Sequence, residues 1–227
     1  MHFQQKKLRY EKYHVKVLKS VLKNDKIRTR NVHVHEMSGA LQKGRIAMLY
    51  IGIDLGTSAV KLLLMDGAGQ IKKIVSKEYP IYFPHPGWSE QKPEDWFAGT
   101  MDGLKELLDG CDKEQVAGIS FGGQMHGLVI LDEEDRVIRP ALLWNDGRTW
   151  EECDYLNNVI GKEKLSEYTA NISFTGFTAP KLLWIRNKEP ENFARIAKIM
   201  LPKDYIAYRL TGVHCTDVSD ASGMLLF

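Results

Sequence analysis

Residues 51–66 have the sequence IGIDLGTSAVKLLLMD, in which two apolar strand patterns flank a short turn of small residues. The alternating sequence IKKIVSKEY, which follows the turn GAGQ, predicts a third strand. Three sequential strands joined by short turns predict an antiparallel meander. A dinucleotide-binding fold is excluded, because its glycine turn leads into a helix, whereas the turn at Gly56 leads into another strand.

The chain after the meander changes from strand to helix and back. Beyond Pro93, apolar residues recur at steps of four, three and four, which predicts an amphipathic helix. The residues on its apolar face are Phe97, Met101, Leu104 and Leu108. Further strand patterns are VAGISF (116–121), the hairpin of GLVILD (127–132) with RVIRP (136–140), and ALLW (141–144). This order predicts an α/β domain with a mixed sheet flanked by helices, not a purely parallel sheet.

The last third of the sequence is predicted to be mainly helical. Pro180, Pro190 and Pro202 each stand where a helix could begin, and Gly212 stands where the last helix would end. The final five residues, GMLLF at 223–227, form an apolar run with no turn or capping residue after it. We expect an unfinished strand there, and a protein that continues beyond it.

Composition and charge divide the chain at about Met48. The 227 residues are 44% hydrophobic and 26% charged, which excludes disordered and collagen-like classes. Residues 1–47 hold 12 Lys and Arg against 3 Asp and Glu, whereas residues 48–227 hold 19 against 26. We therefore expect a basic, poorly ordered N-terminal extension at 1–47 and one acidic domain at 48–227. No apolar run is long enough for a membrane helix and no secretory signal is present, so a cytoplasmic protein without a membrane partner is expected.

Neither the basic extension nor the cysteines predict a function. Lys and Arg at this density attract nucleic-acid backbones, but the extension lacks the aromatic spacing of a stacking surface, so we expect no nucleic-acid partner. Cys111, Cys153 and Cys215 are odd in number and widely spaced. They suit neither a zinc ribbon nor a disulfide framework.

The turn after the first strand is a candidate phosphate site. Backbone amides of Gly56, Thr57 and Ser58 can bind phosphate oxygens, and glycine lets a ligand approach the backbone closely. The carboxylate of Asp54 could position a hydrated Mg²⁺, which prefers one or two carboxylates together with phosphate oxygens. An ordinary hairpin in which the Asp satisfies turn amides is the alternative. Neither of the common glycine-rich phosphate motifs occurs.

Two further polar loops follow predicted strands. SFGGQMHG at 120–127 offers the amide of Gln124, the thioether of Met125 and the imidazole of His126, which suit a small polyol. WNDGR at 144–148 offers Trp144 and Asp146. A structural histidine, and an ion pair between Asp146 and the neighbouring arginine, are the alternatives. Because all three polar segments lie at strand ends, we expect them to form one cleft.

Seven segments together resemble the N-terminal domain of the FGGY family of carbohydrate kinases, and within it the xylulokinase branch. They are DLGTS (54–58), PHPGWSEQKPEDW (84–96), GQMHG (123–127), LLWNDGR (142–148), GFTAPKLLW (176–184), LPKDY (201–205) and SDASG (219–223). The resemblance implies an actin-like ATPase, ribonuclease H-like fold. It also implies transfer of the γ-phosphate of ATP to D-xylulose with Mg²⁺, giving D-xylulose 5-phosphate. Glycerol kinases differ at GQMHG, where they have an Arg-Glu pair.

The resemblance also implies roles for individual residues. Asp54 is expected to be the catalytic and metal-binding carboxylate. Gly56, Thr57 and Ser58 are expected to bind the ATP phosphates, and Met125 and His126 the sugar. With Gln124, Trp144 and Asp146 they make up the candidate site.

The sequence departs from the family pattern in one respect. Family members carry the catalytic base in a Gly-Asp-Asn segment after this domain, and most of the adenine site in a second domain, but this chain contains no Gly-Asp dipeptide. We therefore expect a lobe that lacks the ATP domain and is inactive alone. The alternatives are a non-catalytic sugar-binding fragment and a kinase for another ketose or polyol. Association as a homodimer stays open.

Overall fold

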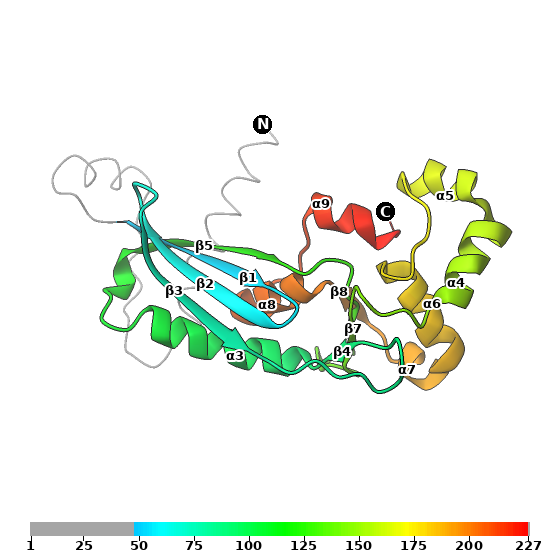
Figure 1. Cartoon of the computed structure of the whole chain (residues 1–227), viewed down its shortest axis with the longest axis horizontal. Helices are drawn as coiled ribbons and strands as arrows, with labels where there is room; N and C mark the ends of the chain where they lie inside the picture. The colour runs from blue at the N-terminus through cyan, green and yellow to red at the C-terminus, as the bar shows by residue number, and fades with distance from the viewer. Residues whose placement is uncertain (1–47, 227) are drawn as a thin grey trace.

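A mixed four-stranded sheet forms the N-terminal half of the described protein. The computed structural model describes residues 48–226, so the predicted extension at 1–47 lies outside the described residues. Strands β1 (Leu49–Leu55), β2 (Ala59–Asp66) and β3 (Ile71–Glu78) are antiparallel neighbours, as the sequence predicts. Strand β5 (Val116–Gly123) lies on the other side of β1 and runs parallel to it (Figure 1). The predicted mixed sheet is therefore confirmed.

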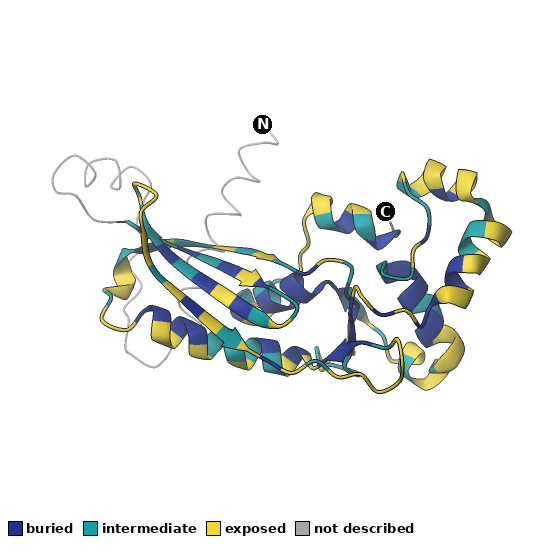
Figure 2. Ribbon diagram, in the orientation of Figure 1, coloured by how far each residue is buried: buried dark blue, intermediate teal, exposed yellow. Residues whose placement is uncertain are grey.

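The core lies where one face of this sheet meets two helices. Alternate residues of β1 and β2 are buried, which Figure 2 shows as dark bands along the strands. Helix α3 (Pro93–Leu107) and helix α8 (Pro202–Thr211) contribute the other half of this core. The buried residues of the two strands are Leu49, Ile51, Ile53, Leu55, Val60, Leu62 and Leu64. This strict period of two fixes which face of the sheet is left for polar residues.

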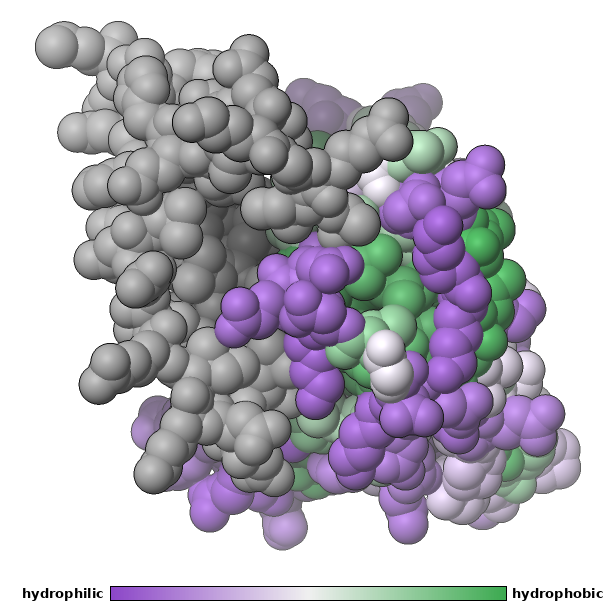
Figure 3. Space-filling model, turned by 90° about the vertical axis from the view of Figure 1, so that its left-hand side faces the viewer, coloured by the Kyte–Doolittle hydropathy of each residue, from purple (hydrophilic) through white to green (hydrophobic). Residues whose placement is uncertain are grey.

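Strand β3 is one of the two edges of the sheet, and β5 is the other. Strand β3 exposes Ile71 and Ile74, and Figure 3 views the molecule from the end at which β2 and β3 are joined, with apolar surface between polar side chains. Lysines at 72, 73 and 77 lie along the same strand. Charged side chains on an edge strand oppose pairing with another chain.

The C-terminal half contains two small sheets and a series of short helices. Strand β4 (Glu90–Gln91) pairs with β7 (Ala141–Leu142), and β6 (Val129–Leu131) pairs with β8 (Lys198–Met200). The remaining helical segments are η1 (Lys113–Gln115), α4 (Trp150–Asp154), the π-helical η2 (Tyr155–Gly161), α5 (Lys162–Thr169), α6 (Thr178–Lys188), α7 (Pro190–Ala194), α9 (Val218–Ala221) and η3 (Ser222–Met224). Among residues 48–226, no helix has both the length and the apolar character needed to cross a membrane.

The last third of the chain is mainly helical, as predicted, but residues 198–200 form a short strand because β6 offers them a ladder partner. One sequence prediction in this half is wrong. The predicted strand at the C-terminus is a helical turn, since Met224 and Leu225 are buried beside helix α9, whose N-terminus is capped by Asp217. A short apolar run does not by itself distinguish strand from helix.

Other predictions in this half hold in part. Helices α7 and α8 begin at Pro190 and Pro202, whereas α6 begins two residues before Pro180. Gly212 ends α8 with a φ of 74°, the left-handed conformation that glycine tolerates. In the predicted hairpin, residues 136–140 make single backbone bonds to β6 and form no strand of their own.

Two glycines of α3 provide a matched test of how closely this helix approaches the sheet. A Cβ at Gly99 would lie 3.6 Å from its nearest neighbour, whereas a Cβ at Gly103 would lie 2.4 Å from Cδ1 of the fully buried Leu62. Alanine favours a helix over glycine by about 1 kcal/mol at either site, and overpacking typically costs about 1–3 kcal/mol. In urea denaturation, we expect Gly99→Ala to stabilise the protein and Gly103→Ala to be at least about 1 kcal/mol less stable than Gly99→Ala. Equal unfolding free energies would contradict the close packing of α3 on β2.

Candidate active site

The turn between β1 and β2 is held rigidly by its own backbone and by the end of β3. The Gly56 amide donates to the carbonyl oxygens of Asp54 at 3.2 Å and Ala59 at 3.0 Å. A Cβ at Gly56 would lie 2.9 Å from the oxygen of Ala59, so this position requires glycine. Tyr79 donates its hydroxyl to the Gly56 carbonyl and its amide to the Ser58 carbonyl.

The amides that can receive a phosphate are therefore fewer than the sequence suggests. The Gly56 amide is used inside the turn. Within residues 48–226, no hydrogen bond engages the amides of Thr57 and Ser58, and the Ser58 side chain is exposed. The turn thus offers two amides and one exposed hydroxyl.

Asp54 lies on the face of the sheet opposite to the core. It is exposed, and its ladder partners are Lys61 on β2 and Gly122 on β5. Directly paired residues point to the same face, so the exposed Lys61 side chain lies beside the carboxylate. A Cβ at Gly122 would meet no atom within 4 Å, so the space on the other side of Asp54 is open.

Sequence reasoning missed Lys61. The signal was a single lysine within the otherwise apolar strand VKLLLMD. Because side chains alternate along a strand, it shares the outward face with Asp54 only once the β1–β2 register is known.

The loop after β5 is joined to this turn through Gln91 of β4. The Gln124 amide donates to the Leu55 carbonyl at 2.7 Å, and the Gln124 side-chain nitrogen donates to Oε1 of Gln91 at 3.1 Å. The Gln91 side-chain nitrogen in turn donates to the Thr57 carbonyl at 2.8 Å. Met125 follows with about half of its surface exposed. The phosphate turn and the Gln-Met-His loop are therefore neighbours, in agreement with the predicted cleft.

His126 has an unusual backbone conformation that several groups stabilise. Its φ is 62°, and its carbonyl accepts hydrogen bonds from Thr178 Oγ1 at 3.2 Å and Lys181 Nζ at 3.0 Å. Its ring packs on Phe177 with centroids 4.7 Å apart, and Nδ1 lies 3.1 Å from the Gly223 carbonyl oxygen. Burial lowers the pKa of His126 more than the bond to Gly223 raises it. The imidazole is therefore neutral at pH 7.

Lys181 is a second residue that sequence reasoning missed, because the segment GFTAPKLLW gave no sign that its lysine reaches the His126 loop. Its side chain is fully buried, and Nζ also donates to the Gly176 carbonyl. Burial lowers the pKa of Lys181 to about 7, although the charge of Asp146 opposes this shift. The lysine holds the backbone of the His126 loop through its hydrogen bond to the His126 carbonyl. A lysine inside an apolar helical sequence was the available signal.

Trp144 connects the third polar loop to the phosphate turn. About half of its surface is exposed, and its indole nitrogen donates to Thr57 Oγ1 at 3.0 Å. Thr57 is therefore held twice, by Gln91 at its carbonyl and by Trp144 at its hydroxyl. Thr57 is thus bonded directly to the Trp144 loop and, through Gln91, to the Gln-Met-His loop.

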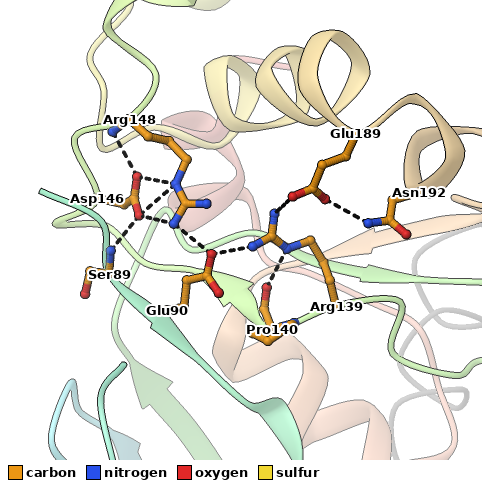
Figure 4. A network of polar contacts seen from close by, with 8 residues as sticks. All are labelled: Ser89, Glu90, Arg139, Pro140, Asp146, Arg148, Glu189 and Asn192. Atoms are coloured by element: carbon orange, nitrogen blue, oxygen red, sulfur yellow. Dashed lines mark hydrogen bonds and ion pairs between the residues drawn. The ribbon is translucent and has the colours of Figure 1, made fainter. Parts of the chain in front are cut away.

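Asp146 is placed differently from the other predicted site residues. Its side chain is 1% exposed, and its carboxylate bonds to Arg148 and to the Ser89 amide at 2.6 Å (Figure 4). Arg148 also pairs with Glu90 at 2.8 Å. This is the ion pair that the sequence left open as the alternative. The geometry gives Asp146 a role in fixing the Trp144 loop and does not favour direct contact with a substrate.

The charged network around Asp146 extends through the small β4–β7 sheet. Arg139 pairs with Glu90 and with Glu189, the latter at 2.5 Å (Figure 4). The Arg148 guanidinium lies 3.7 Å from the ring centroid of Trp88 and 4.8 Å from that of Trp184. A buried charge is tolerated when it is both paired and hydrogen-bonded.

The described residues offer a single carboxylate for a metal at the phosphate turn. Within residues 48–226, no three His, Cys, Asp or Glu side chains gather as a metal site. Asp54 suits Mg²⁺ held by one carboxylate, with phosphate oxygens and water as further ligands.

Comparison with known proteins identifies a family. The model of the FGGY family of carbohydrate kinases, N-terminal domain, matches residues 49–227. The xylulose kinase of Staphylococcus xylosus is 46% identical over 177 residues, which are 78% of this chain and 37% of that protein. The xylulose kinase of Escherichia coli strain K12 is 45% identical over 78% of this chain and 36% of its own length. The chain thus spans little more than a third of these relatives.

Solved structures agree with the sequence comparison. A xyloylose kinase from Brucella ovis matches with a TM-score of 0.74 and 43% identity, over 78% of this chain and 36% of that one. The xylulose kinase of Rhodospirillum rubrum matches with a TM-score of 0.75 and 29% identity, over 79% of this chain and 37% of that one. The predicted actin-like ATPase fold, with a mixed sheet flanked by helices, is confirmed.

Lys181→Met tests the buried lysine through the pH dependence of stability. The pKa of Lys181 is about 7 in the folded protein and about 10.4 in an unfolded chain, so the unfolded state binds more protons between these values. The unfolding free energy of the unaltered protein should therefore rise relative to that of the variant from pH 7 to pH 9, by at most about 1.4 kcal/mol per pH unit. Urea titrations at both pH values measure this difference.

Lys162→Met is the matched control, because Lys162 is exposed. The difference in unfolding free energy between Lys162→Met and the unaltered protein should be the same at pH 7 and pH 9. A Lys181→Met difference that is independent of pH would contradict the lowered pKa.

Proposed function

Because the chain belongs to the FGGY family of carbohydrate kinases, we propose that residues 48–227 form the sugar-binding domain of an ATP-dependent kinase that phosphorylates D-xylulose to D-xylulose 5-phosphate. The observation that carries the proposal is the hydrogen-bonded junction at Thr57. There the phosphate turn is bonded directly to the Trp144 loop and, through Gln91, to the Gln-Met-His loop. A sugar and a phosphoryl donor bound at these segments would be adjacent, as phosphoryl transfer requires.

The phosphate side of the proposed site consists of groups that bind and position anions. The amides of Thr57 and Ser58 make no hydrogen bond to other described residues and are available to a phosphate, and Lys61 adds a positive charge. Asp54 would hold the Mg²⁺ that accompanies ATP. ATP would supply the phosphoryl group, and the metal ion would neutralise part of the negative charge of the phosphates. Phosphoryl transfer depends mainly on positioning and charge stabilisation, which these groups provide.

The sugar side consists of uncharged groups. Met125 and Trp144 present half-exposed apolar surfaces that suit the carbon chain of a ketose. The neutral imidazole of His126 and the amide of Gln124 suit its hydroxyl groups. A neutral polyol is therefore favoured over an anionic substrate. A kinase that uses ATP in this way belongs in the cytoplasm.

A second candidate function is sugar binding without phosphoryl transfer. It is favoured by the described residues of the sugar side, Gln124, Met125, His126 and Trp144, among which there is no carboxylate to take the proton of a sugar hydroxyl. In that case the Thr57 junction would bind a sugar, and no residue described here would take the proton of its hydroxyl.

Calorimetry and an ADP assay on this chain separate the two functions. We expect heat of binding with D-xylulose and none with glycerol at the same concentration. ADP formation with D-xylulose and MgATP would favour the kinase, and binding without ADP would favour the sugar-binding domain. Equal heats with glycerol, or tighter binding of another ketose, would contradict the proposed substrate.

Asp54→Asn should separate chemistry from sugar binding. In a form of the protein that also carries an ATP-binding domain, we expect D-xylulose-dependent ADP release to fall by about 100-fold or more, because the carboxylate that positions the metal is lost. D-xylulose affinity should stay within about twofold, since the sugar side is built from other loops. Asp102→Asn, at an exposed position of α3, is the control and should leave both quantities unchanged. Normal turnover in Asp54→Asn would refute the role of Asp54.

A further inference from the structure

Gln91 lies at the centre of the site without belonging to any of its three loops. It is 1% exposed and bonds to four partners from four parts of the chain. Its Oε1 accepts from the Trp96 indole at 3.0 Å and from the Gln124 side chain at 3.1 Å. Its Nε2 donates to the carbonyls of Thr57 at 2.8 Å and Pro80 at 3.2 Å.

The chemistry of these partners allows only one orientation of the Gln91 amide. An indole nitrogen only donates, so the atom facing Trp96 must be the oxygen. Backbone carbonyls only accept, so the atom facing Thr57 and Pro80 must be the nitrogen. A flipped amide would break all of these bonds at once.

The fixed orientation of Gln91 also fixes that of Gln124. Because Oε1 of Gln91 can only accept, Gln124 must turn its NH₂ group toward it. The Gln124 oxygen then points away from Gln91. This oxygen is buried and has no hydrogen-bond partner among the described residues, and the residue as a whole is only 9% exposed. A buried carbonyl without a donor is an unstable arrangement unless a ligand or water supplies one.

We propose that Gln91 is a positioning residue, which holds the Gln124 oxygen as an acceptor for a hydroxyl group of the sugar and fixes the Thr57 turn in the same register. This inference rests on the proposed function, since the ligand is the sugar of the proposed reaction. The inference also says which group of the sugar binds. The Gln124 oxygen can only accept a hydrogen bond, so a hydroxyl group of the ketose binds to it and the ketose carbonyl oxygen does not.

The coupling between the two glutamines is the measurable consequence. D-xylulose affinity would be measured by calorimetry for Gln91→Met, Gln124→Met and the double variant, with the exposed Gln70→Met as control. We expect each single variant to bind at least tenfold more weakly, and the double variant to bind no more weakly than Gln124→Met, because Gln91 acts on the sugar through Gln124. The control should bind as the unaltered chain does.

Gln91→Glu tests the orientation without changing the size of the side chain. A protonated carboxyl group has one acceptor oxygen and a single donor, so it can keep the shorter bond to the Thr57 carbonyl and loses the longer bond to the Pro80 carbonyl, whereas an ionised carboxylate has no donor for either. Burial favours the protonated form. The affinity of Gln91→Glu relative to the unaltered chain, taken at each pH, should be close to one at pH 5.5 and at least tenfold lower at pH 8. This ratio removes every effect of pH that the two proteins share.

The outcomes distinguish failure of the inference from failure of the proposed function. No binding of D-xylulose by the unaltered chain contradicts both. If the unaltered chain and Gln124→Met bind D-xylulose equally well, the Gln124 oxygen binds water and not the sugar. That result would overturn the inference and leave the proposed function standing. Additive losses in the double variant, or a Gln91→Glu ratio that does not change with pH, overturn the inference as well. Melting temperatures and circular dichroism show whether each variant is folded, and Gln91→Glu at pH 5.5 serves as the folded reference.

Discussion

The parallel pairing of β1 with β5 is the constraint on which the site depends. Parallel neighbours end at the same edge of a sheet, so the turn after Leu55 and the loop after Gly123 must emerge side by side. The contact is close at this end, since a Cβ at Gly123 would lie 2.8 Å from the Leu55 carbonyl oxygen and Cβ. Glycine there lets the Gln124 amide continue the ladder to Leu55. An antiparallel arrangement of the same two strands would place the phosphate turn and the sugar loop at opposite ends.

Buried charges fix the remaining two loops in place. The Trp144 loop is held by Asp146 and Arg148, and the His126 loop by Lys181. These are costly interactions, because each buried ion loses its hydration, and burial lowers the pKa of the lysine to about 7. Such buried charges contribute little to the free energy of unfolding, but they require their partners at defined positions. Their positions beneath the candidate site are consistent with a requirement for fixed loop conformations in a chain of the FGGY family.

The sequence predicts the parts of the structure that depend on local pattern. Alternating apolar residues give the meander and its buried face, and strand ends mark the polar loops that meet at Thr57. Gln91, Lys61 and Lys181 were not predicted as parts of the site, because their roles depend on neighbours distant in sequence. Gln91 lies 34 residues from Thr57 and 33 from Gln124. The incorrect prediction of a strand at the C-terminus has the same cause. Met224 and Leu225 would suit either a strand or a helix, and they are helical because they pack beside helix α9.

The two bonds at Thr57 differ in how easily a ligand can replace them. The Gln91 bond to the carbonyl is partly buried and its donor residue is only 1% exposed, so breaking it would leave a buried amide without one of its partners. The Trp144 bond to the hydroxyl belongs to a half-exposed indole, for which water or a ligand can substitute at little cost. A sugar that contacts Trp144 can therefore release the Thr57 hydroxyl while the turn backbone stays fixed. The domain carries 19 basic against 26 acidic residues, so its overall charge does not attract phosphate. In the proposed function, anion binding would therefore rest on local groups, which are two backbone amides, a hydroxyl and Lys61, in a turn whose backbone is bonded to one buried glutamine.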